Sequence, residues 1–282
     1  MHRRRLGASL RSLRAAAGMT LAEAAAKLGM QAPTLSRVEN GKQRVPIVSL
    51  AGYFEIYEPV PEEQKAKIRA LATLASSGKR SNLLDQFTGV VKEGDSFAEY
   101  LNLSELAVRE ERYTCVVPGL LQTREYARSV VERSRSWSTR REIDNFVALR
   151  MARQERISRA KEPLGFWCVL DEAALHRQVG DRRVMREQLG RLLELTGDRP
   201  HVGLQVLPFS YGAHAGIDGA FSLLHFPAGS PVALVESMTT TLYLEEEANI
   251  GRYEAAFQYL RSEALDTDGS RRLIRQLLKD RA

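Results

Sequence analysis

The stretch that decides the fold of the first part of the chain is TLAEAAAKLGMQAPTLSRVENGKQR, residues 20–44. Gly29 follows a run of helix-favouring residues, and glycine is typical of a helix end because it tolerates the left-handed backbone conformation found there. A second helix is predicted to run from residue 31 to residue 39. Leu35 and Val38 lie three positions apart, so they would share its buried face. The stretch therefore predicts two short helices joined by a tight turn.

The second of these helices would expose polar and basic side chains. The residues that point away from its buried face are Gln31, Thr34, Ser36 and Arg37. A short helix that presents amides, hydroxyls and a guanidinium at its start suits the floor of the DNA major groove. We therefore predict that this helix contacts DNA.

Further helices are predicted on both sides of this pair. Leucines at helical spacing predict a helix over residues 5–17, and Thr20 followed by Glu23 is the pattern of a capping box at the next helix start. Pro46 is predicted to be the first residue of a fourth helix, and a fifth is expected after Pro59. Together they form an all-α, five-helix domain.

The charge of the chain is concentrated in this helical part. The 282 residues carry a net charge of +6, and residues 1–60 alone hold nine Lys/Arg against four Glu, or +5. A basic patch beside a groove-sized helix indicates phosphate binding, so double-stranded DNA is the expected partner.

The remaining composition excludes several classes of protein. A hydrophobic content of 44% and a charged content of 27% are ordinary for a soluble globular protein. No run approaches the ~18 apolar residues of a membrane span, and no apolar signal-peptide core follows the basic N-terminus. Cys115 and Cys168 are far apart and are expected to be reduced thiols. We expect a cytoplasmic protein with no membrane partner, associated with the nucleoid when it is bound to DNA.

The second part of the chain has a different pattern. The run GFWCVL (165–170) is typical of a buried strand, and helices are expected before and after it. Later short apolar segments separated by turn residues are predicted strands: HVGLQVLPF, GAFSLLHF, PVALVES and TLYLE. Two helices are expected to close the chain, over 248–263 and 268–279. We predict a helix-turn-helix domain over 1–78, a linker and lead-in over 79–95, and an α+β domain with a mixed or antiparallel sheet over 96–282.

Two resemblances cover nearly the whole chain. Residues 10–46, LRSLRAAAGMTLAEAAAKLGMQAPTLSRVENGKQRVP, resemble the lambda/434-repressor-like helix-turn-helix domain of xenobiotic-response-element regulators. The second part is similar to the C-terminal domain of unknown function of a large actinobacterial family of antitoxin-like transcriptional regulators. The matching motifs are EERYTCVVPGLLQTREYA, LRMARQERI, VLDEAALHRQVG, REQLGRLLEL, LQVLPFSYGAHAG, GAFSLLHF and VESMTTTLYLEE. The resemblance implies a regulator, often encoded beside a small partner protein, and supplies no ligand.

The first resemblance implies roles for individual residues of the contact helix. Gln31 and Thr34 match positions that touch the phosphate backbone, whereas Ala32, Pro33 and Arg37 match positions that face base edges. Ala32 and Pro33 offer no side-chain hydrogen bonds, so base reading rests on Arg37, with apolar contact to a thymine methyl from Ala32.

The resemblance also assigns residues around the contact helix. Asn40, Lys42 and Arg44 match a loop that grips a flanking phosphate. Arg14 and Glu39 match an ion pair between two helices, which is the better explanation of Glu39 because a carboxylate facing DNA would be repelled.

An enzymatic role has weaker support. Asp171 and Glu172 with His176, and separately His214, could supply an acid, a base or metal ligands, but the two acidic residues fit a helix start. The histidines lack metal-ligand spacing, and no glycine-rich phosphate loop or nucleophile elbow is present. We therefore expect no catalysis, no metal and no cofactor. Arg150, Glu172 and His214 remain a candidate small-molecule pocket.

The sequence thus predicts a dimeric, sequence-specific transcriptional regulator that binds an operator through residues 31–39. Its α+β domain would sense a signal, form the homodimer or dock a partner. The alternative is an antitoxin-like interaction protein whose main target is a small partner protein.

Overall fold

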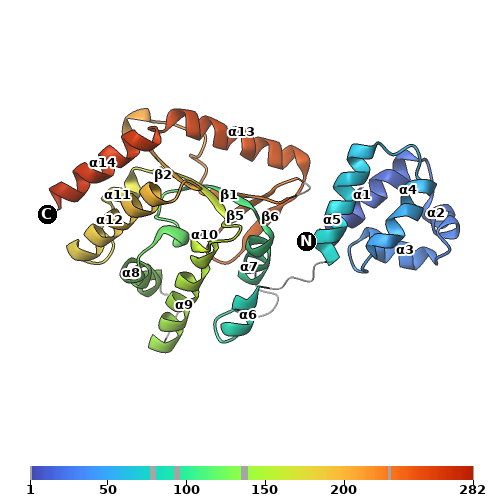
Figure 1. Cartoon of the computed structure of the whole chain (residues 1–282), viewed down its shortest axis with the longest axis horizontal. Coiled ribbons are helices and arrows are strands. Elements are labelled where there is room, and N and C mark those ends of the chain that lie inside the picture. The colour runs from blue at the N-terminus through green and yellow to red at the C-terminus, as the bar shows by residue number, and fades with distance from the viewer. Residues whose placement is uncertain (1, 77–80, 92–95, 135–138, 228–229, 282) are drawn as a thin grey trace. The chain divides into compact units, whose positions relative to one another are not determined.

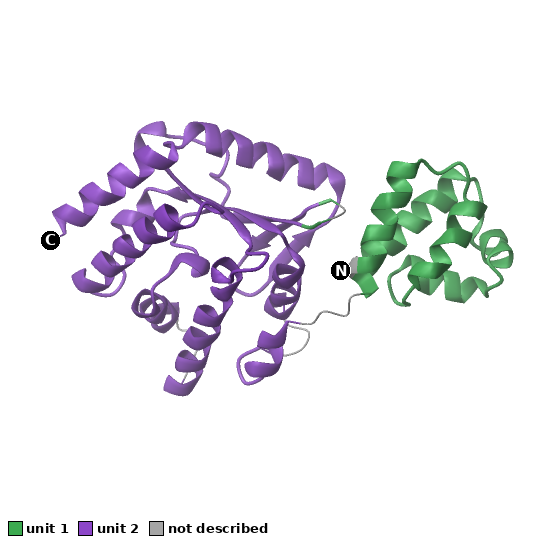
Figure 2. Ribbon diagram, in the orientation of Figure 1, with its two compact units in different colours: residues 1–79, 226–230 green, residues 80–225, 231–282 purple. Residues whose placement is uncertain are grey.

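The computed structural model describes residues 2–76, 81–91, 96–134, 139–227 and 230–281. It divides into two compact units (Figure 2): unit 1 comprises residues 1–79 with 226–230, and unit 2 comprises residues 80–225 with 231–282. Of the linker predicted over 79–95, residues 79–80 and 92–95 lie outside the described residues. A short helix, α6 (Asn82–Gln86), occupies part of the remainder.

Unit 1 is all-helical, as predicted. Its helices (Figure 1) are α1 (His2–Ala16), α2 (Leu21–Lys27), α3 (Ala32–Glu39), α4 (Leu50–Ile56) and α5 (Glu62–Ser76). They enclose one core, in which Leu10, Leu35, Leu50 and Ile68 are fully buried. The fourth helix was predicted too early, because Pro46 caps a short 3₁₀ turn (Ile47–Ser49) and α4 starts only after it.

Backbone hydrogen bonds define the turn between α2 and α3. Gly29 has a φ of +66°, so it occupies the left-handed region expected from the sequence. Its N–H donates to the carbonyl of Ala26 at 3.1 Å, and the N–H of Met30 donates to that of Ala25 at 2.9 Å. These two bonds form a Schellman motif that satisfies the last carbonyls of α2. The predicted capping box at the start of α2 is also present.

Two further glycines, Gly7 and Gly41, let the backbones of α1 and α3 meet. A Cβ on Gly7 would lie 2.4 Å from the carbonyl oxygen of Val38 in α3. Gly41, just after α3, has a φ of +69°, and a Cβ there would lie 2.6 Å from the backbone nitrogen of Arg4. The position of α3 against α1 therefore depends on the absence of side chains at these two residues.

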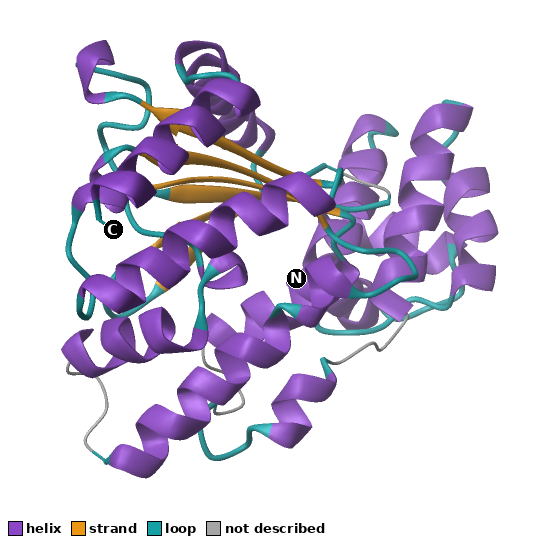
Figure 3. Cartoon of the chain, turned by 60° about the vertical axis from the view of Figure 1, so that its left-hand side comes forward, coloured by secondary structure: helices purple, strands orange, loops and turns teal. Residues whose placement is uncertain are grey.

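Unit 2 is built on a mixed sheet, in agreement with the predicted α+β class. The described strands are β1 (Arg109–Thr114), β2 (Gly165–Asp171), β3 (Val202–Leu207), β4 (Phe221–His225), β5 (Val232–Glu236) and β6 (Thr241–Leu244). Their order in the sheet is β3-β2-β1-β4-β5-β6. Figure 3 shows the strands in orange, with helices packed around them. β1 and β3 run parallel to β2. β4 pairs antiparallel with β1, β5 with β4, and β6 with β5.

The central strand β1 is the main element that the sequence pattern does not predict. Its sequence REERYT is too charged to resemble a strand that is paired on both sides. Glu110 and Glu111 are nevertheless buried. Each has a cationic or hydrogen-bonding partner, so their burial does not leave isolated charges.

Helices cover both faces of the sheet. The described helices after α6 are α7 (Ser96–Leu106), α8 (Arg124–Ser134), α9 (Arg140–Arg153), α10 (Glu155–Ser158), α11 (Ala173–His176), α12 (Arg182–Asp198), α13 (Glu247–Glu263) and α14 (Thr267–Asp280). α13 packs on one face through a core that includes Tyr113, Phe221 and Phe257. The two predicted closing helices are confirmed as α13 and α14.

Two predictions about the chain as a whole can be compared with the described residues. None of their helices combines the length and hydropathy needed to cross a membrane. Both cysteines are free thiols, Cys115 exposed and Cys168 buried, as predicted.

Candidate functional site

The outward face of α3 carries most of the predicted contact residues. Leu35 and Val38 are buried in the unit 1 core, which turns the opposite face of the helix to solvent. The contact residues that are exposed are Gln31, Pro33, Arg37, Asn40, Lys42 and Arg44, and those that are half-buried are Ala32, Thr34 and Ser36. The structure thus places the predicted set on one short helix and the loop after it.

The first turn of α3 is open to a ligand. Gln31 is the N-cap residue, but its side chain forms no capping hydrogen bond. Pro33 has no N–H group and the N–H of Thr34 donates to the carbonyl of Gln31 at 2.9 Å, so the partial positive charge of the helix N-terminus is what favours a phosphate here. Ala32 differs from its neighbours because it packs against the unit 1 core. Its methyl group is therefore partly occupied by packing within the protein.

Arg37 is held in place on the exposed face. Its Nε donates to Oε1 of Gln43 and one terminal nitrogen donates to Oγ1 of Thr34, both at 3.2 Å. Gln43 was not among the predicted site residues. A signal for it does exist in the sequence, since it lies beside Lys42 in the predicted phosphate loop. The two weak bonds orient the guanidinium without burying it.

Arg14 and Glu39 form an ion pair that joins α1 to the end of α3. Nε and the second terminal nitrogen of Arg14 donate to the two carboxylate oxygens at 2.6 and 2.9 Å. This hydrogen bonding raises the pKa of Arg14. Nε of Arg11 lies 3.5 Å from the same carboxylate. Because the Glu39 side chain is only 2% exposed, its charge serves the packing of unit 1 rather than a ligand.

The loop after α3 has one basic side chain without an internal partner among the described residues. Asn40 donates to the carbonyl of Ser36 at 2.8 Å and accepts from Arg11 at 2.5 Å. Arg44 donates to the carbonyl of Ser76 at 3.2 Å. Lys42 is exposed and forms no such bond. It is therefore the member of the loop best placed to meet a phosphate.

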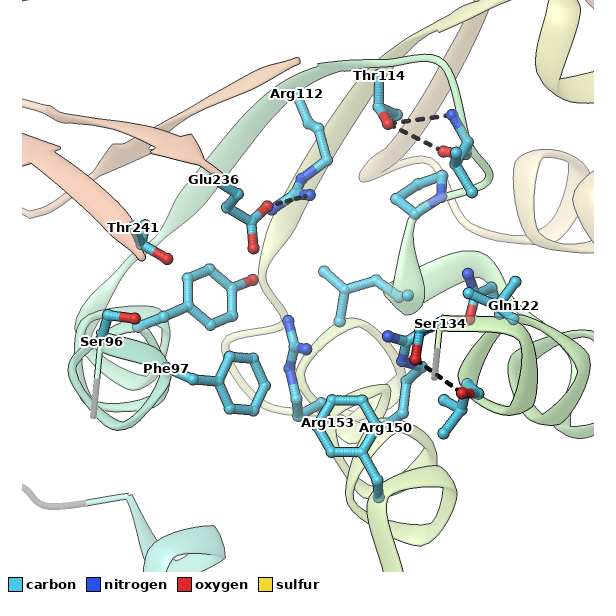
Figure 4. Close-up of a pocket in the computed structure, with 18 of the residues that line it drawn as sticks. Ser96, Phe97, Arg112, Thr114, Gln122, Ser134, Arg150, Arg153, Glu236 and Thr241 are labelled. Carbon is cyan, nitrogen blue, oxygen red and sulfur yellow. Dashed lines mark hydrogen bonds and ion pairs between the residues drawn. The ribbon is translucent and has the colours of Figure 1, made fainter. Parts of the chain in front are cut away.

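The structure does not bring the three candidate pocket residues of the second part together. Arg150 lines a pocket of about 750 Å³ in unit 2 (Figure 4), whereas Glu172 and His214 are not among the residues that line it. The Glu172 carboxylate lies 3.1 Å from Nε2 of His176 and accepts from the N–H of Phe209 at 2.8 Å. Glu172 thus fixes the segment after β3.

His214 lies in a separate cluster at the ends of β1 and β2. The hydroxyl of Tyr113 is 3.4 Å from both Nε2 of His214 and Oδ2 of Asp171, and 3.7 Å from Sγ of Cys115. Burial, followed by the contact with Cys115, raises the pKa of Tyr113. Across the described part of the chain, no group of three or more His, Cys, Asp or Glu residues could hold a metal ion.

The sequence pattern did not predict most of the pocket that Arg150 lines. The other charged residues that line this pocket are Glu110, Arg112, Arg153 and Glu236. Two signals could have indicated it. Arg150 and Arg153 lie three positions apart on a predicted helix, and REERYT contains two Glu residues between two Arg residues. The partners of those charges come from distant segments, so local pattern alone could not assemble the pocket.

Comparison with known families agrees with these two units. Residues 5–74 match a helix-turn-helix domain, so the chain is a DNA-binding regulator of the helix-turn-helix class. Residues 97–276 match the family described as a domain of unknown function (DUF5753). Since that match covers more than half of the chain, the chain belongs to this family. No match was found among the curated proteins or the solved structures.

Proposed function

We propose that the protein is a sequence-specific transcriptional regulator that binds a double-stranded operator as a homodimer. The observation that carries the proposal is the division of α3 into two faces. One face is buried in the unit 1 core through Leu35 and Val38, and the other presents Arg37 and the polar first turn. This face fits the width of a major groove, and the adjoining loop supplies a cation at its edge.

The contacts divide into those that position the protein and those that read sequence. Gln31 and the partial positive charge at the N-terminus of α3 bind the phosphate backbone, together with Thr34 and Lys42. Arg37 reads a base edge, because a guanidinium can donate two hydrogen bonds to guanine. It exchanges its weak bonds to Thr34 and Gln43 for bonds to the base. Since Ala32 packs against the core, Arg37 carries most of the side-chain readout.

Dimerisation would place two copies of α3 on one face of the duplex. Helix-turn-helix dimers read half-sites about one helical turn, ~34 Å, apart. We assign dimer formation, signal sensing or partner docking to unit 2. We propose no catalytic role for Asp171, Glu172, His176 or His214, because each side chain has contacts within the protein.

Three finer assignments stay predictions. The first is membership of the lambda/434-like, xenobiotic-response-element subfamily. The second is the antitoxin-like alternative, in which the main target is a small partner protein. The third is a location in the cytoplasm, at the nucleoid when DNA is bound. Of the three, the antitoxin-like alternative differs most from the proposed operator-binding regulator, since it does not require that the protein prefer one DNA sequence.

Substitution of Arg37 tests the proposal on the full-length chain. Arg37→Ala should weaken binding to the preferred operator by roughly 1–3 kcal/mol and relax preference at one base position per half-site. The matched control is Lys67→Ala, which removes a positive charge from an exposed ion pair on α5. Fluorescence anisotropy on operator variants measures both effects. Equal affinity and equal base preference for the two variants would remove Arg37 from the proposed role.

A further inference from the structure

A pocket in unit 2 lies on the face of the sheet opposite α13. Side chains from α7, α8, α9, β1 and the hairpin between β5 and β6 line it, and its volume is about 750 Å³ (Figure 4). Pockets of ~300–1,000 Å³ hold small organic ligands. Every residue lining this pocket belongs to unit 2, so its chemistry can be considered without reference to unit 1.

One of the three arginines in the pocket is neutralised by the protein. Nε of Arg112 lies 3.0 Å from the carboxylate of Glu110, and a terminal nitrogen lies 2.9 Å from that of Glu236. The remaining oxygen of Glu110 accepts from the Tyr100 hydroxyl at 3.0 Å. The pKa of Glu236 is lowered, chiefly by the charge of Arg112, and this keeps the carboxylate ionised. These four side chains form a closed network that leaves no cation for a ligand.

The other two arginines form no close ion pair among the described residues, although the charge of Glu236 also acts on both. Among the described residues, no acidic oxygen lies within ion-pair distance of Arg150 or Arg153, which stand three positions apart on α9. Arg150 donates one hydrogen bond, to Oε1 of Gln122 at 2.9 Å, and Arg153 donates none. Burial, and then the charge of Arg153, lower the pKa of Arg150 to about 10. An anion between the two guanidinium groups would offset the cost of burying their charges and would reduce their mutual repulsion.

Aromatic rings hold these guanidinium groups in fixed positions. Arg153 lies 5.2 Å from the ring centre of Phe97 and 4.6 Å from that of Tyr100, and Arg150 lies 5.3 Å from that of Phe146. Stacked arginines lose less side-chain freedom when they bind an anion. The same rings give the pocket an apolar surface, and Figure 4 shows Arg150 and Arg153 directed into the space that the rings border.

We propose that this pocket binds a small organic anion. Its carboxylate or phosphate group is held by Arg150 and Arg153, and its ring-sized apolar body lies against Phe97 and Phe146. Arg112 stays in its network with the two glutamates. The inference concerns unit 2 alone and is measured without DNA. It can therefore fail while the proposed DNA binding holds, and the reverse is also possible.

A pair of fluorescent dyes tests the proposal on the full chain. Anilinonaphthalene sulfonate is an aromatic anion, and N-phenylnaphthylamine is its uncharged counterpart. Both are titrated into the wild-type protein and into Arg150→Gln, Arg153→Gln and the matched control Arg141→Gln. Arg141 is exposed, lies on the same helix and does not line the pocket. Circular dichroism checks folding, and if Arg150→Gln fails to fold then Arg153→Gln decides.

The expected result is a charge-specific loss of binding. Each pocket variant should bind the sulfonate about tenfold more weakly, as expected for one lost charged hydrogen bond, while the uncharged dye is unaffected. Competition by AMP would then indicate a phosphate-bearing ligand, and competition by salicylate a carboxylate-bearing one. The proposal is overturned if the pocket variants match Arg141→Gln, if both dyes weaken equally, or if neither competitor displaces the sulfonate.

Discussion

The ion pair between Arg14 and Glu39 gives the sharpest test of how α3 is held. Replacing either residue with glutamine removes one charge but keeps a side chain of similar polarity. The two substitutions should not be equivalent, because the Glu39 side chain is 2% exposed and that of Arg14 is 16% exposed. A charge left alone is more costly where water cannot reach it.

The expected magnitudes follow from what each variant leaves behind. Arg14→Gln leaves a buried carboxylate whose nearest cation is Arg11, 3.5 Å away, so unit 1 should lose about 3 kcal/mol. Glu39→Gln leaves Arg14, whose side chain is 16% exposed, in contact with solvent and still bonded to the carbonyl of Met19 at 2.8 Å. That variant should lose only about 1–2 kcal/mol. The double variant has no unpaired buried charge and should be more stable than Arg14→Gln alone.

Hydrogen exchange followed by mass spectrometry can measure these differences in the full chain. Amides of α1 to α3 report on unit 1, and those of β1 to β3 serve as an internal control. A loss of about 3 kcal/mol accelerates exchange of the most protected unit 1 amides by roughly 150-fold. Equal acceleration in the two single variants, or a double variant less stable than Arg14→Gln, would refute the reasoning.

Three other predictions concern the turn after α3, the acid sensitivity of unit 2 and the phosphate loop. Gly41→Ala should destabilise unit 1 by about 2–4 kcal/mol, measured by hydrogen exchange, because the added Cβ would meet the backbone of α1. In Gly29→Ala the added Cβ meets nothing within 4 Å, so that variant should lose only about 1 kcal/mol, and similar losses in the two variants would contradict the close approach at Gly41. Arg112 lowers the pKa of Glu236 below its unfolded value of ~4.3, so the ion pair between them stabilises unit 2 above that pH and stops doing so as the pH falls through the lower folded pKa. Glu236→Gln should therefore make the melting temperature depend less on pH in the acid range, and an unchanged dependence would contradict this prediction. Lys42→Ala should weaken binding to all DNA sequences alike and reduce the salt slope by about one, whereas a sequence-selective effect in anisotropy titrations would contradict phosphate contact.

Local signals explain why the helix-turn-helix could be predicted from the sequence. The ends of α2 depend on a capping box and on Gly29, and the buried face of α3 depends on the spacing of Leu35 and Val38. Each signal lies within a few residues of the structure that it determines. The start of α4 was misplaced because Pro46 fits the first turn of a 3₁₀ segment as well as that of an α-helix.

Long-range partners explain why the centre of unit 2 could not be predicted. β1 is a strand although its sequence is charged, since Arg112 pairs with Glu236, 124 positions away. The same distance hides the pocket. The spacing of Arg150 and Arg153 places them on one side of α9, but nothing in that spacing identifies the facing elements. Glu172 carries a charge suited to a ligand site, and its carboxylate instead binds the backbone of Phe209.

The most direct test of the central claim, that the exposed face of α3 reads a DNA sequence, is selection from random duplexes with the purified full-length protein. Bound duplexes are recovered at physiological salt over several rounds and sequenced. We predict one enriched motif with two related halves about one helical turn apart, and loss of one base preference in each half with Arg37→Ala. Recovery of duplexes with no shared motif, by a folded protein, would contradict the claim.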